Sequence, residues 1–511
     1  MLADSPGLSD RAWRWMLCGL CAVLLAPFAL VDVPPLQDYP NHLARLVVLA
    51  AGADDPVLAG FYAPRWRVMP DLGIELLGVP LLAVLPVHVV GRLLAAAALL
   101  LPVLGTLACA RAMGNRSPWP FAVGLVAYNQ TYLLGFLNFS LGLGLALLFA
   151  AAWLRWRERF PVASVALGAV AAIVLFACHL MGLLFYALLI GAHEAAMLGF
   201  PLRWRDLARR GGAGIAVLAV PLALYAGSEL HGTEAPILFL SPVAKLEQAL
   251  APVVNYRLSL DVLTGGVLLV LPLVWLLTRV WMPSRAAWVA MAGLLVLYAA
   301  APYGFKGTFS LDTRFIIMFG FVLIASLSPI GLSRRMGALA GGGLTLLFVA
   351  RMGVLLAAWN GHRADLADLR AAIAPVPAGA SVFLTTVSPE EASTYWAAGP
   401  ASRRLSNGAR VDTHMPALLV IERRAWWPLL FDNPSQQPIE TRPPWRALAE
   451  RFGGLDGHTN PGLDPCGFDY LLLLEADAID PAAYAPDRLT LLRAVGFAAL
   501  YRVNVIPSCS R

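Results

Sequence analysis

Charged residues are scarce in this chain. Only 14% of its 511 residues are Asp, Glu, Lys or Arg, whereas 59% are hydrophobic. A soluble domain has about 25% charged residues. The mean hydropathy is +0.68. This composition excludes a wholly soluble protein and predicts a chain that crosses a membrane many times.

Several short motifs are also missing. The sequence contains no Gly-x-x-x-x-Gly-Lys phosphate loop, no dinucleotide-binding glycine pattern and no HExxH. ATP-driven transport and zinc proteolysis therefore lack their usual signatures.

Cysteine is infrequent too. The six cysteines are too few and too scattered for a disulfide framework or a zinc site. Four of them fall in apolar segments, where a small buried thiol is expected. The other two, Cys466 and Cys509, share the polar carboxyl-terminal part. They either bridge, if that part faces an oxidising compartment, or stay free thiols.

The net charge of +6 does not indicate nucleic-acid binding. The arginines stand in short clusters between hydrophobic segments, around residues 155–159, 203–210, 279–285 and 334–335. That distribution is typical of cytoplasmic loops in a membrane protein. We therefore expect no nucleic-acid partner.

Long apolar runs fill the first part of the chain. The first, residues 13–31, is followed by Pro-Pro and not by a small-residue cleavage site, so we interpret it as a retained anchor. The other candidate spans are residues 72–90, 91–110, 118–131, 133–153, 162–178, 181–198, 214–226, 262–277, 286–301, 315–327 and 337–358.

The basic clusters decide the orientation of these spans. These clusters can all lie on the cytoplasmic side only if residues 118–131 do not cross the membrane. That run is short and has a polar end, so we interpret it as a half-helix. We therefore expect an all-α polytopic bundle with about eleven crossings, a bacterial inner-membrane location and a carboxyl terminus outside the cytoplasm.

The sequence after residue 358 has the composition of a globular domain. Apolar runs at 381–386, 417–422, 468–475 and 498–503 alternate with helix-like segments. This pattern predicts an extracytoplasmic α/β or α+β domain over 359–511 with a small sheet. The transmembrane module then covers 1–358, with an outer loop at 32–71.

The outer loop contains the polar run DVPPLQDYPNHLAR, residues 32–45. Asp38 stands on a proline-stiffened turn, where a carboxylate could act as a general base or ligate a divalent ion. The alternative is a helix N-cap. Asp32 is either a second participant or an interfacial anchor. His42 and Arg45 share a helix face and could meet one phosphate, or form a solvated polar face.

Four further residues in later loops are candidates for substrate binding. Arg314, at the start of a late span, could present its planar fork to a lipid phosphate, or could pair with Asp312. Arg257 and Lys306 have similar positions near the outer surface. His179 lies between two apolar runs and either faces the same cavity or is a structural histidine.

These features resemble the GT-C superfamily of integral-membrane glycosyltransferases. The similarity covers a first span, an outer loop with an acidic residue, about ten further spans and an outward globular region. The resemblance implies transfer of a sugar from a polyprenyl-phosphate carrier to a lipid, glycan or protein acceptor at the outer face. It implies Asp38 as the catalytic carboxylate, with Asp32 as the competing candidate, and Arg314 near the carrier phosphate.

Metal dependence stays open at this stage. The first loop lacks an Asp-x-Asp or Asp-Glu pair, so no metal ligands are assigned, and a divalent cation such as Mg²⁺ or Mn²⁺ is an option.

Two other functions compete with the glycosyltransferase. One is a transporter or flippase of lipid-linked material, favoured by the polar interruption near residues 128–131. The other is a non-catalytic membrane scaffold.

Overall fold

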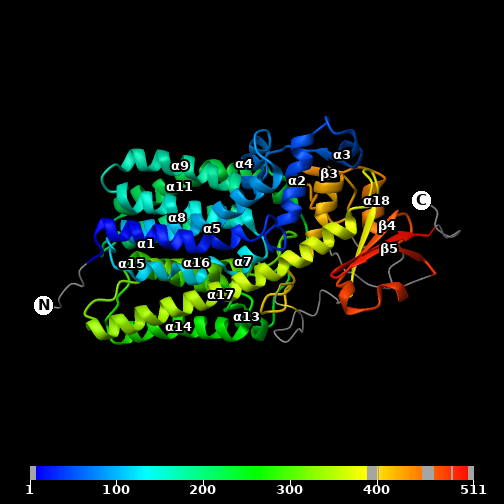
Figure 1. The fold of residues 1–511 in the computed structure, drawn as a ribbon. Helices are drawn as coiled ribbons and strands as arrows, with labels where there is room; N and C mark the ends of the chain where they lie inside the picture. Colours follow the sequence, from blue (N-terminus) through cyan, green and yellow to red (C-terminus); the bar gives the residue numbers. More distant parts are fainter. Residues whose placement is uncertain (1–6, 388–399, 401, 452–464, 485–486, 505–511) are drawn as a thin grey trace. The chain divides into compact units, whose positions relative to one another are not determined.

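The computed structural model describes residues 7–387, 400, 402–451, 465–484 and 487–504 (Figure 1). The chain divides into two compact units. The helical unit contains Met1–Ala26, Val68–Ile74 and Ala95–Leu355. The sheet unit contains Pro27–Arg67, Glu75–Leu94 and Leu356–Arg511. The predicted domain limits at residues 358 and 359 stay a prediction.

Long apolar helices dominate the chain. Among the described residues, seven helices are long and apolar enough to cross a membrane, and three shorter apolar helices accompany them. The seven are α1 (Asp10–Leu25, continued to Ala29 by a 3₁₀ turn), α5 (Val87–Ala112), α8 (Leu137–Trp156), α9 (Pro161–Cys178), α11 (Trp204–Ala226), α14 (Leu258–Leu277) and α17 (Arg334–Ile373). The three shorter ones are α4 (Gly73–Leu82), α10 (Leu180–Ala196) and α15 (Arg285–Ala300). α16 (Leu311–Ser326) is a further helix of 16 residues. The predicted helical membrane bundle with a small carboxyl-terminal sheet is confirmed, whereas the number of crossings stays a prediction.

One predicted span is wrong. We expected a continuous segment over residues 72–90, but α4 (Gly73–Leu82) ends early and α5 begins at Val87. Two prolines explain the break. Pro80 lies inside α4, and Pro86 disfavours helical geometry at the residue before it. Hydropathy alone does not reveal this, because the turn residues are themselves apolar.

The segment predicted to form one half-helix is broken up, and whether it crosses the membrane stays a prediction. It forms three short pieces, η2 (Trp119–Val123), α6 (Gly124–Ala127) and α7 (Gln130–Leu133). Asn129 caps α7 by accepting from Tyr132 N at 3.2 Å and also accepts from Thr131 Oγ1 at 2.7 Å. The polar groups are therefore buried in protein and paired, as irregular backbone at membrane depth requires.

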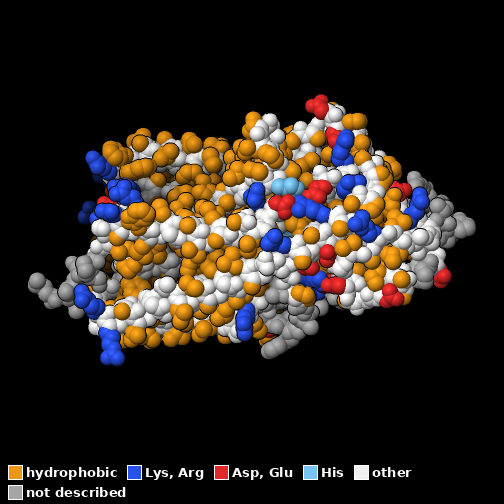
Figure 2. All heavy atoms as spheres, in the orientation of Figure 1, with side chains coloured by type: hydrophobic (Ala, Val, Ile, Leu, Met, Phe, Trp, Pro, Cys, Tyr) orange, Lys and Arg blue, Asp and Glu red, His pale blue; other side chains and the backbone are white. Residues whose placement is uncertain are grey.

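Close helix packing builds the core of the helical unit. A Cβ added at Gly182 of α10 would lie 2.8 Å from backbone atoms of Gly142 in α8. The two backbones approach so closely because both residues lack a side chain. In Figure 2 apolar side chains cover the visible face of the long helices, while Lys and Arg gather at the end where α1 begins.

The sheet unit contains a four-stranded mixed sheet in the order β2-β4-β6-β5. β2 (Val382–Thr386) is parallel to β4 (Tyr470–Leu474), with Val382 opposite Tyr470, and β4 is antiparallel to β6 (Ala498–Val503). These strands confirm three of the four predicted apolar runs. β5 (Leu489–Val495) is an edge strand with mostly exposed side chains, which is why its pattern gave no signal.

The fourth predicted strand is wrong. Residues 417–422 were expected to be extended, but Leu419–Arg423 form a single π-helical turn that follows η3 (Met415–Ala417). The run is short and its apolar residues are buried, and a short buried apolar run fits a helix as well as a strand.

Residues 32–67, most of the loop predicted after the first span, are part of the sheet unit. β1 (Tyr62–Pro64) pairs antiparallel with β3 (Ile439–Thr441). In α2 (Tyr39–Ala51), Asn41 donates to Leu429 O at 2.7 Å and accepts from Phe431 N at 2.9 Å. The loop is therefore held by a strand pair and by buried hydrogen bonds to residues near the carboxyl terminus. The remaining helices of this unit include α3 (Pro56–Phe61) and α18 (Trp445–Arg451).

A buried ion pair provides a test of the helical unit. Arg351 Nη1 lies 2.6 Å from Asp261 Oδ1, and both side chains are almost fully buried. Removing one partner leaves an uncompensated buried charge, which costs about 3–5 kcal/mol. We expect Arg351→Met to lower the unfolding temperature in detergent markedly, and Arg351→Met with Asp261→Leu to recover most of the loss. Equal stability of the single variant and the parent would contradict this assignment.

Candidate functional site

Asp38 lies at the turn that begins α2. It occupies the N-cap position, but its side chain makes no capping hydrogen bond. Instead, Asp38 Oδ1 lies 3.0 Å from His414 Nδ1, and the two side chains are only 13% and 9% exposed. The structure therefore disfavours the N-cap interpretation and places the carboxylate against an imidazole.

Aromatic rings enclose the His414 side chain. Its ring centre is 5.0 Å from that of Phe431 and 5.9 Å from that of Trp427, both edge-on. The ring of His42 also meets Phe431 edge-on, at 6.2 Å. These walls limit the orientations open to His414 and reduce the access of water to Asp38.

Sequence analysis missed His414. It is far from Asp38 along the chain, and the segment around it, Arg-Val-Asp-Thr-His, matches no recognisable motif. The sequence feature that could have drawn attention to His414 was the nearby acidic residue, Asp412, in the carboxyl-terminal part. That signal does not indicate a partner in the first outer loop.

Asp32 has a different environment. Its carboxylate forms an ion pair with Arg370 at 2.7 Å, and Arg370 also pairs with Glu422 at 2.7 Å. His88 Nε2 lies 3.1 Å from the same Glu422. Burial raises the pKa of both carboxyls, but the hydrogen bonds and charge of Arg370, with the His88 interaction, outweigh it. The pKa values of Asp32 and Glu422 are therefore lower than usual.

His42 and Arg45 lie on one face of α2, as predicted. Arg45 Nη2 is 2.8 Å from His42 Nδ1, and Arg45 Nε donates to Glu75 Oε1 at 2.9 Å. Arg45 and Glu75 are 2% and 0% exposed and His42 is half-buried, so the alternative of a solvated polar face is wrong for Arg45. Arg45 Nη1 is also buried, with no hydrogen-bond partner among the described residues. Phosphate binding by these two residues stays a prediction.

A second group of predicted residues meets inside the helical unit. Arg314, in the first turn of α16, has its Nη1 3.2 Å from His179 Nε2. Its guanidinium lies over the rings of Phe136 and Phe139, at 5.2 and 5.4 Å. His179 Nδ1 in turn lies 3.6 Å from Asp71 Oδ1. The structure thus brings together two of the predicted substrate-binding residues and adds Asp71.

Asp312 does not pair with Arg314. Lys245 Nζ lies 3.6 Å from Asp312 Oδ2, so the competing interpretation of Arg314 as the partner of Asp312 is wrong. Lys306 donates to the backbone oxygens of His231 at 2.6 Å and Thr233 at 3.1 Å. Arg257 is exposed at the start of α14.

The structure bears on whether Cys466 forms a disulfide and on whether a metal ion could bind. Cys466 is disulfide-bonded, whereas Cys509 lies outside the described residues. The described part of the chain contains no group of three or more His, Cys, Asp or Glu side chains that could hold a metal ion. The divalent cation stays a prediction, and we derive no step through it.

Comparisons with known proteins give few matches. No model of a known protein family matches the sequence, and no curated protein does. A solved structure, ArnT from Cupriavidus metallidurans bound to undecaprenyl phosphate, is similar over 98% of this chain and 100% of that chain. The sequence identity is 12% and the TM-score is 0.49. These values do not identify a family, so the GT-C resemblance stays a prediction.

Removing Arg370 should change the pH dependence of stability. Asp32 and Glu422 have folded-state pKa values below their ordinary values of 3.8 and 4.5. The two carboxylates therefore add to the free energy of unfolding at neutral pH, and this stabilisation is lost as the pH falls below those values. We expect Arg370→Gln to be less stable than the parent at pH 7, with the difference narrowing in acid.

Unfolding temperatures between pH 7 and pH 3 would measure this effect. The control is Arg363→Gln, which removes an exposed arginine on the same helix that contacts only Asn360 in the described structure. A difference between Arg370→Gln and the parent that does not depend on pH would contradict the assignment.

Proposed function

We propose that this protein is a membrane glycosyltransferase. It moves a sugar from a polyprenyl-phosphate carrier to a lipid, glycan or protein acceptor at the outer face of the membrane. The observation that carries the proposal is the enclosed Asp38 carboxylate held 3.0 Å from His414. A mostly buried carboxylate with a titratable partner is the kind of group that general-base catalysis requires.

Asp38 acts as the base in this proposal. Its carboxylate takes the proton of the acceptor hydroxyl as that oxygen forms a bond to the anomeric carbon. The bond between the anomeric carbon and the phosphate oxygen breaks, and the electron pair leaves with the polyprenyl phosphate. No nucleotide is needed, because the carrier phosphate is itself the leaving group.

His414 is a positioning residue. It contacts the carboxylate of Asp38 and not the substrate, and its ring is held by Phe431 and Trp427. An imidazole at this distance limits the positions open to the carboxylate oxygen of Asp38. An arginine would also orient the carboxylate, but it would hold it as a permanently neutralised ion pair.

Arg314 and His179 are proposed to bind the carrier phosphate. The guanidinium of Arg314 is fixed over two phenylalanine rings, so little side-chain entropy is lost when it binds an anion. A planar donor fork in a water-poor site suits a phosphate whose negative charge grows as the sugar leaves. We also propose, without the support that the ring packing gives to Arg314, that the carrier phosphate contacts four other basic residues: Arg257, Lys306, His42 and Arg45.

Two observations support the proposed orientation. Lys and Arg gather at the end of the helical unit where α1 begins (Figure 2), which is typical of the cytoplasmic side. The disulfide at Cys466 favours an oxidising compartment for the sheet unit. We therefore propose a bacterial inner-membrane protein whose carboxyl-terminal part lies outside the cytoplasm.

Asp38→Asn tests the base. The amide has nearly the same shape but accepts a proton poorly, so we expect sugar transfer by the purified protein to fall by about 10²–10⁴-fold. Asp54→Asn, at an exposed position in the same unit, should leave the rate unchanged. We expect His414→Gln to lower kcat with little change in KM and to alter the pH profile.

Two outcomes would decide against this proposal. Unaltered transfer by Asp38→Asn would remove Asp38 as the base. No transfer by the parent from any polyprenyl-phosphate sugar would favour the transporter or the scaffold.

Arg314→Lys tests the phosphate contact. The ammonium keeps the charge but loses the planar fork, so we expect KM for the carrier to rise about tenfold, or about 1.4 kcal/mol. Inhibition by free polyprenyl phosphate should weaken in parallel. Arg205→Lys, at an exposed position among the arginines near the start of α11, is the control. An unchanged KM for Arg314→Lys would remove Arg314 from the carrier site.

A further inference from the structure

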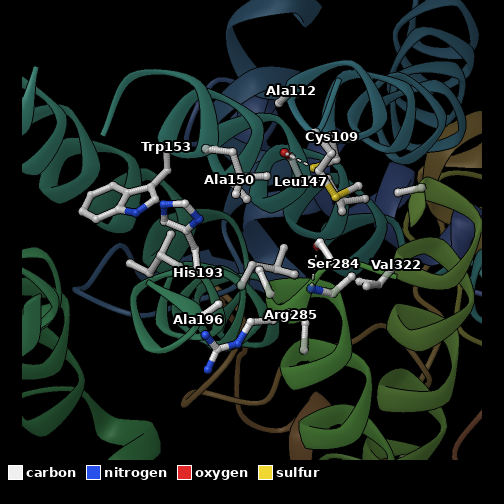
Figure 3. A pocket seen from close by; sticks show the side chains of 18 of the residues that line it. Cys109, Ala112, Leu147, Ala150, Trp153, His193, Ala196, Ser284, Arg285 and Val322 are labelled. Atoms are coloured by element: carbon white, nitrogen blue, oxygen red, sulfur yellow. Dashed lines mark hydrogen bonds between the residues drawn. The ribbon is translucent and has the colours of Figure 1, made fainter. Parts of the chain in front are cut away.

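A cavity of about 440 Å³ lies among α5, α8, α10, α15 and α16 of the helical unit (Figure 3). This volume is within the range of small-ligand sites. Its walls are mainly apolar, with Leu147, Ile190 and Val322 among the lining residues. Such a wall suits an acyl chain and does not suit a polar metabolite.

Polar groups are restricted to a few positions in this cavity. Figure 3 shows the labelled side chains of His193, Ser284 and Arg285 around it. His193 Nε2 is buried and has no hydrogen-bond partner among the described residues. A buried ring nitrogen without a partner costs free energy, and a ligand oxygen in the cavity would satisfy it.

The start of α15 adds anion-binding groups. Ser284 is the N-cap, and its hydroxyl accepts from Ala287 N at 3.2 Å. The first amides of a helix have no intrahelical acceptor, and the helix dipole favours an anion at this end. Arg285 follows immediately and is exposed, so it adds a full positive charge.

Glu194, which follows His193 in the chain, does not cancel this charge. Glu194 forms ion pairs with Arg157 at 3.0 Å and with Arg210 at 2.8 Å, and it accepts from Trp153 Nε1 at 3.0 Å. Its negative charge is therefore compensated within its own network. The charge of Arg285 stays available to an anion.

We infer that this cavity binds an acidic phospholipid of the cytoplasmic leaflet. The phosphate lies at Arg285, the first turn of α15 and His193, and one acyl chain lies along the apolar wall. The cavity is at the end of α15 that follows the arginine-rich loop, and in the proposed orientation this end faces the cytoplasm. The inner leaflet supplies anionic lipids at that depth. The site is separate from the proposed catalytic residues, and its occupant is a structural or regulatory lipid and not the sugar carrier.

Native mass spectrometry of the purified full chain tests this inference. The detergent-solubilised protein is titrated with phosphatidylglycerol and, separately, with phosphatidylcholine. We expect one tightly held phosphatidylglycerol per chain, and at least tenfold weaker retention of phosphatidylcholine. Arg285→Ala should reduce retention of phosphatidylglycerol about tenfold, which corresponds to about 1.4 kcal/mol. Ala286→Phe, which fills part of the cavity, should also reduce it.

Matched variants keep the test specific. Arg334→Ala removes an exposed arginine at the start of α17, and Ala166→Phe adds a ring at an exposed position on α9. Both should retain the lipid as the parent does, and sn-glycerol 3-phosphate should not compete. Three results would overturn the inference: equal retention of both lipids, equal loss in Arg285→Ala and Arg334→Ala, or displacement by glycerol phosphate alone.

Discussion

The structure depends on the rule that a buried charge needs a partner. A carboxylate moved from water into a protein interior costs several kcal/mol unless a cation and hydrogen bonds compensate it. Most deeply buried acids in the described part of the chain follow the rule with arginines, whereas Asp312 lies 3.6 Å from Lys245 Nζ. The pairs are Asp261 with Arg351, Glu194 with Arg157 and Arg210, Glu75 with Arg45, and Asp412 and Glu475 with Arg410.

This rule makes Asp38 notable. Arginine does not release its proton, so a carboxylate paired with it stays ionised and neutralised. Asp38 instead has a histidine beside it, with its Oδ1 3.0 Å from His414 Nδ1. Asp71 has a similar but looser relation to His179, at 3.6 Å, and there Arg314 is also in contact with the ring. These two acids therefore contact histidines, whereas the acids listed above are held by arginines.

The membrane imposes a related constraint on the backbone. Helices satisfy their own amides, so an interruption must be repaired by side chains or neighbouring segments. The pieces around Asn129 show such a repair, with the side chain capping the next turn. The break between α4 and α5 ends at prolines, which lack the amide that would need a partner. At each interruption the sequence therefore supplies a residue that avoids an unpaired backbone amide: Asn129 in the first case and proline in the second.

Hydropathy and composition were enough to predict most of the fold. Ten of the twelve predicted apolar segments correspond to single helices, because a run that long and that apolar is buried or in lipid whatever its neighbours are. The predictions failed where the decision depended on neighbours. The turn after Leu82 and the π-helical turn at Leu419–Arg423 are both apolar and short, and the β5 edge strand has few buried side chains to show a period.

The sequence alone determined that the chain is a helical membrane protein with a small mixed domain, and it pointed to an acidic outer loop and to Arg314. Those properties follow from composition and from residues close together along the chain. Only the tertiary structure decided the partners: His414 for Asp38, Glu75 for Arg45, Arg370 for Asp32 and His179 for Arg314. Each pair joins residues distant in sequence. Pairing across such distances is set by how helices and strands pack, and no local pattern encodes it.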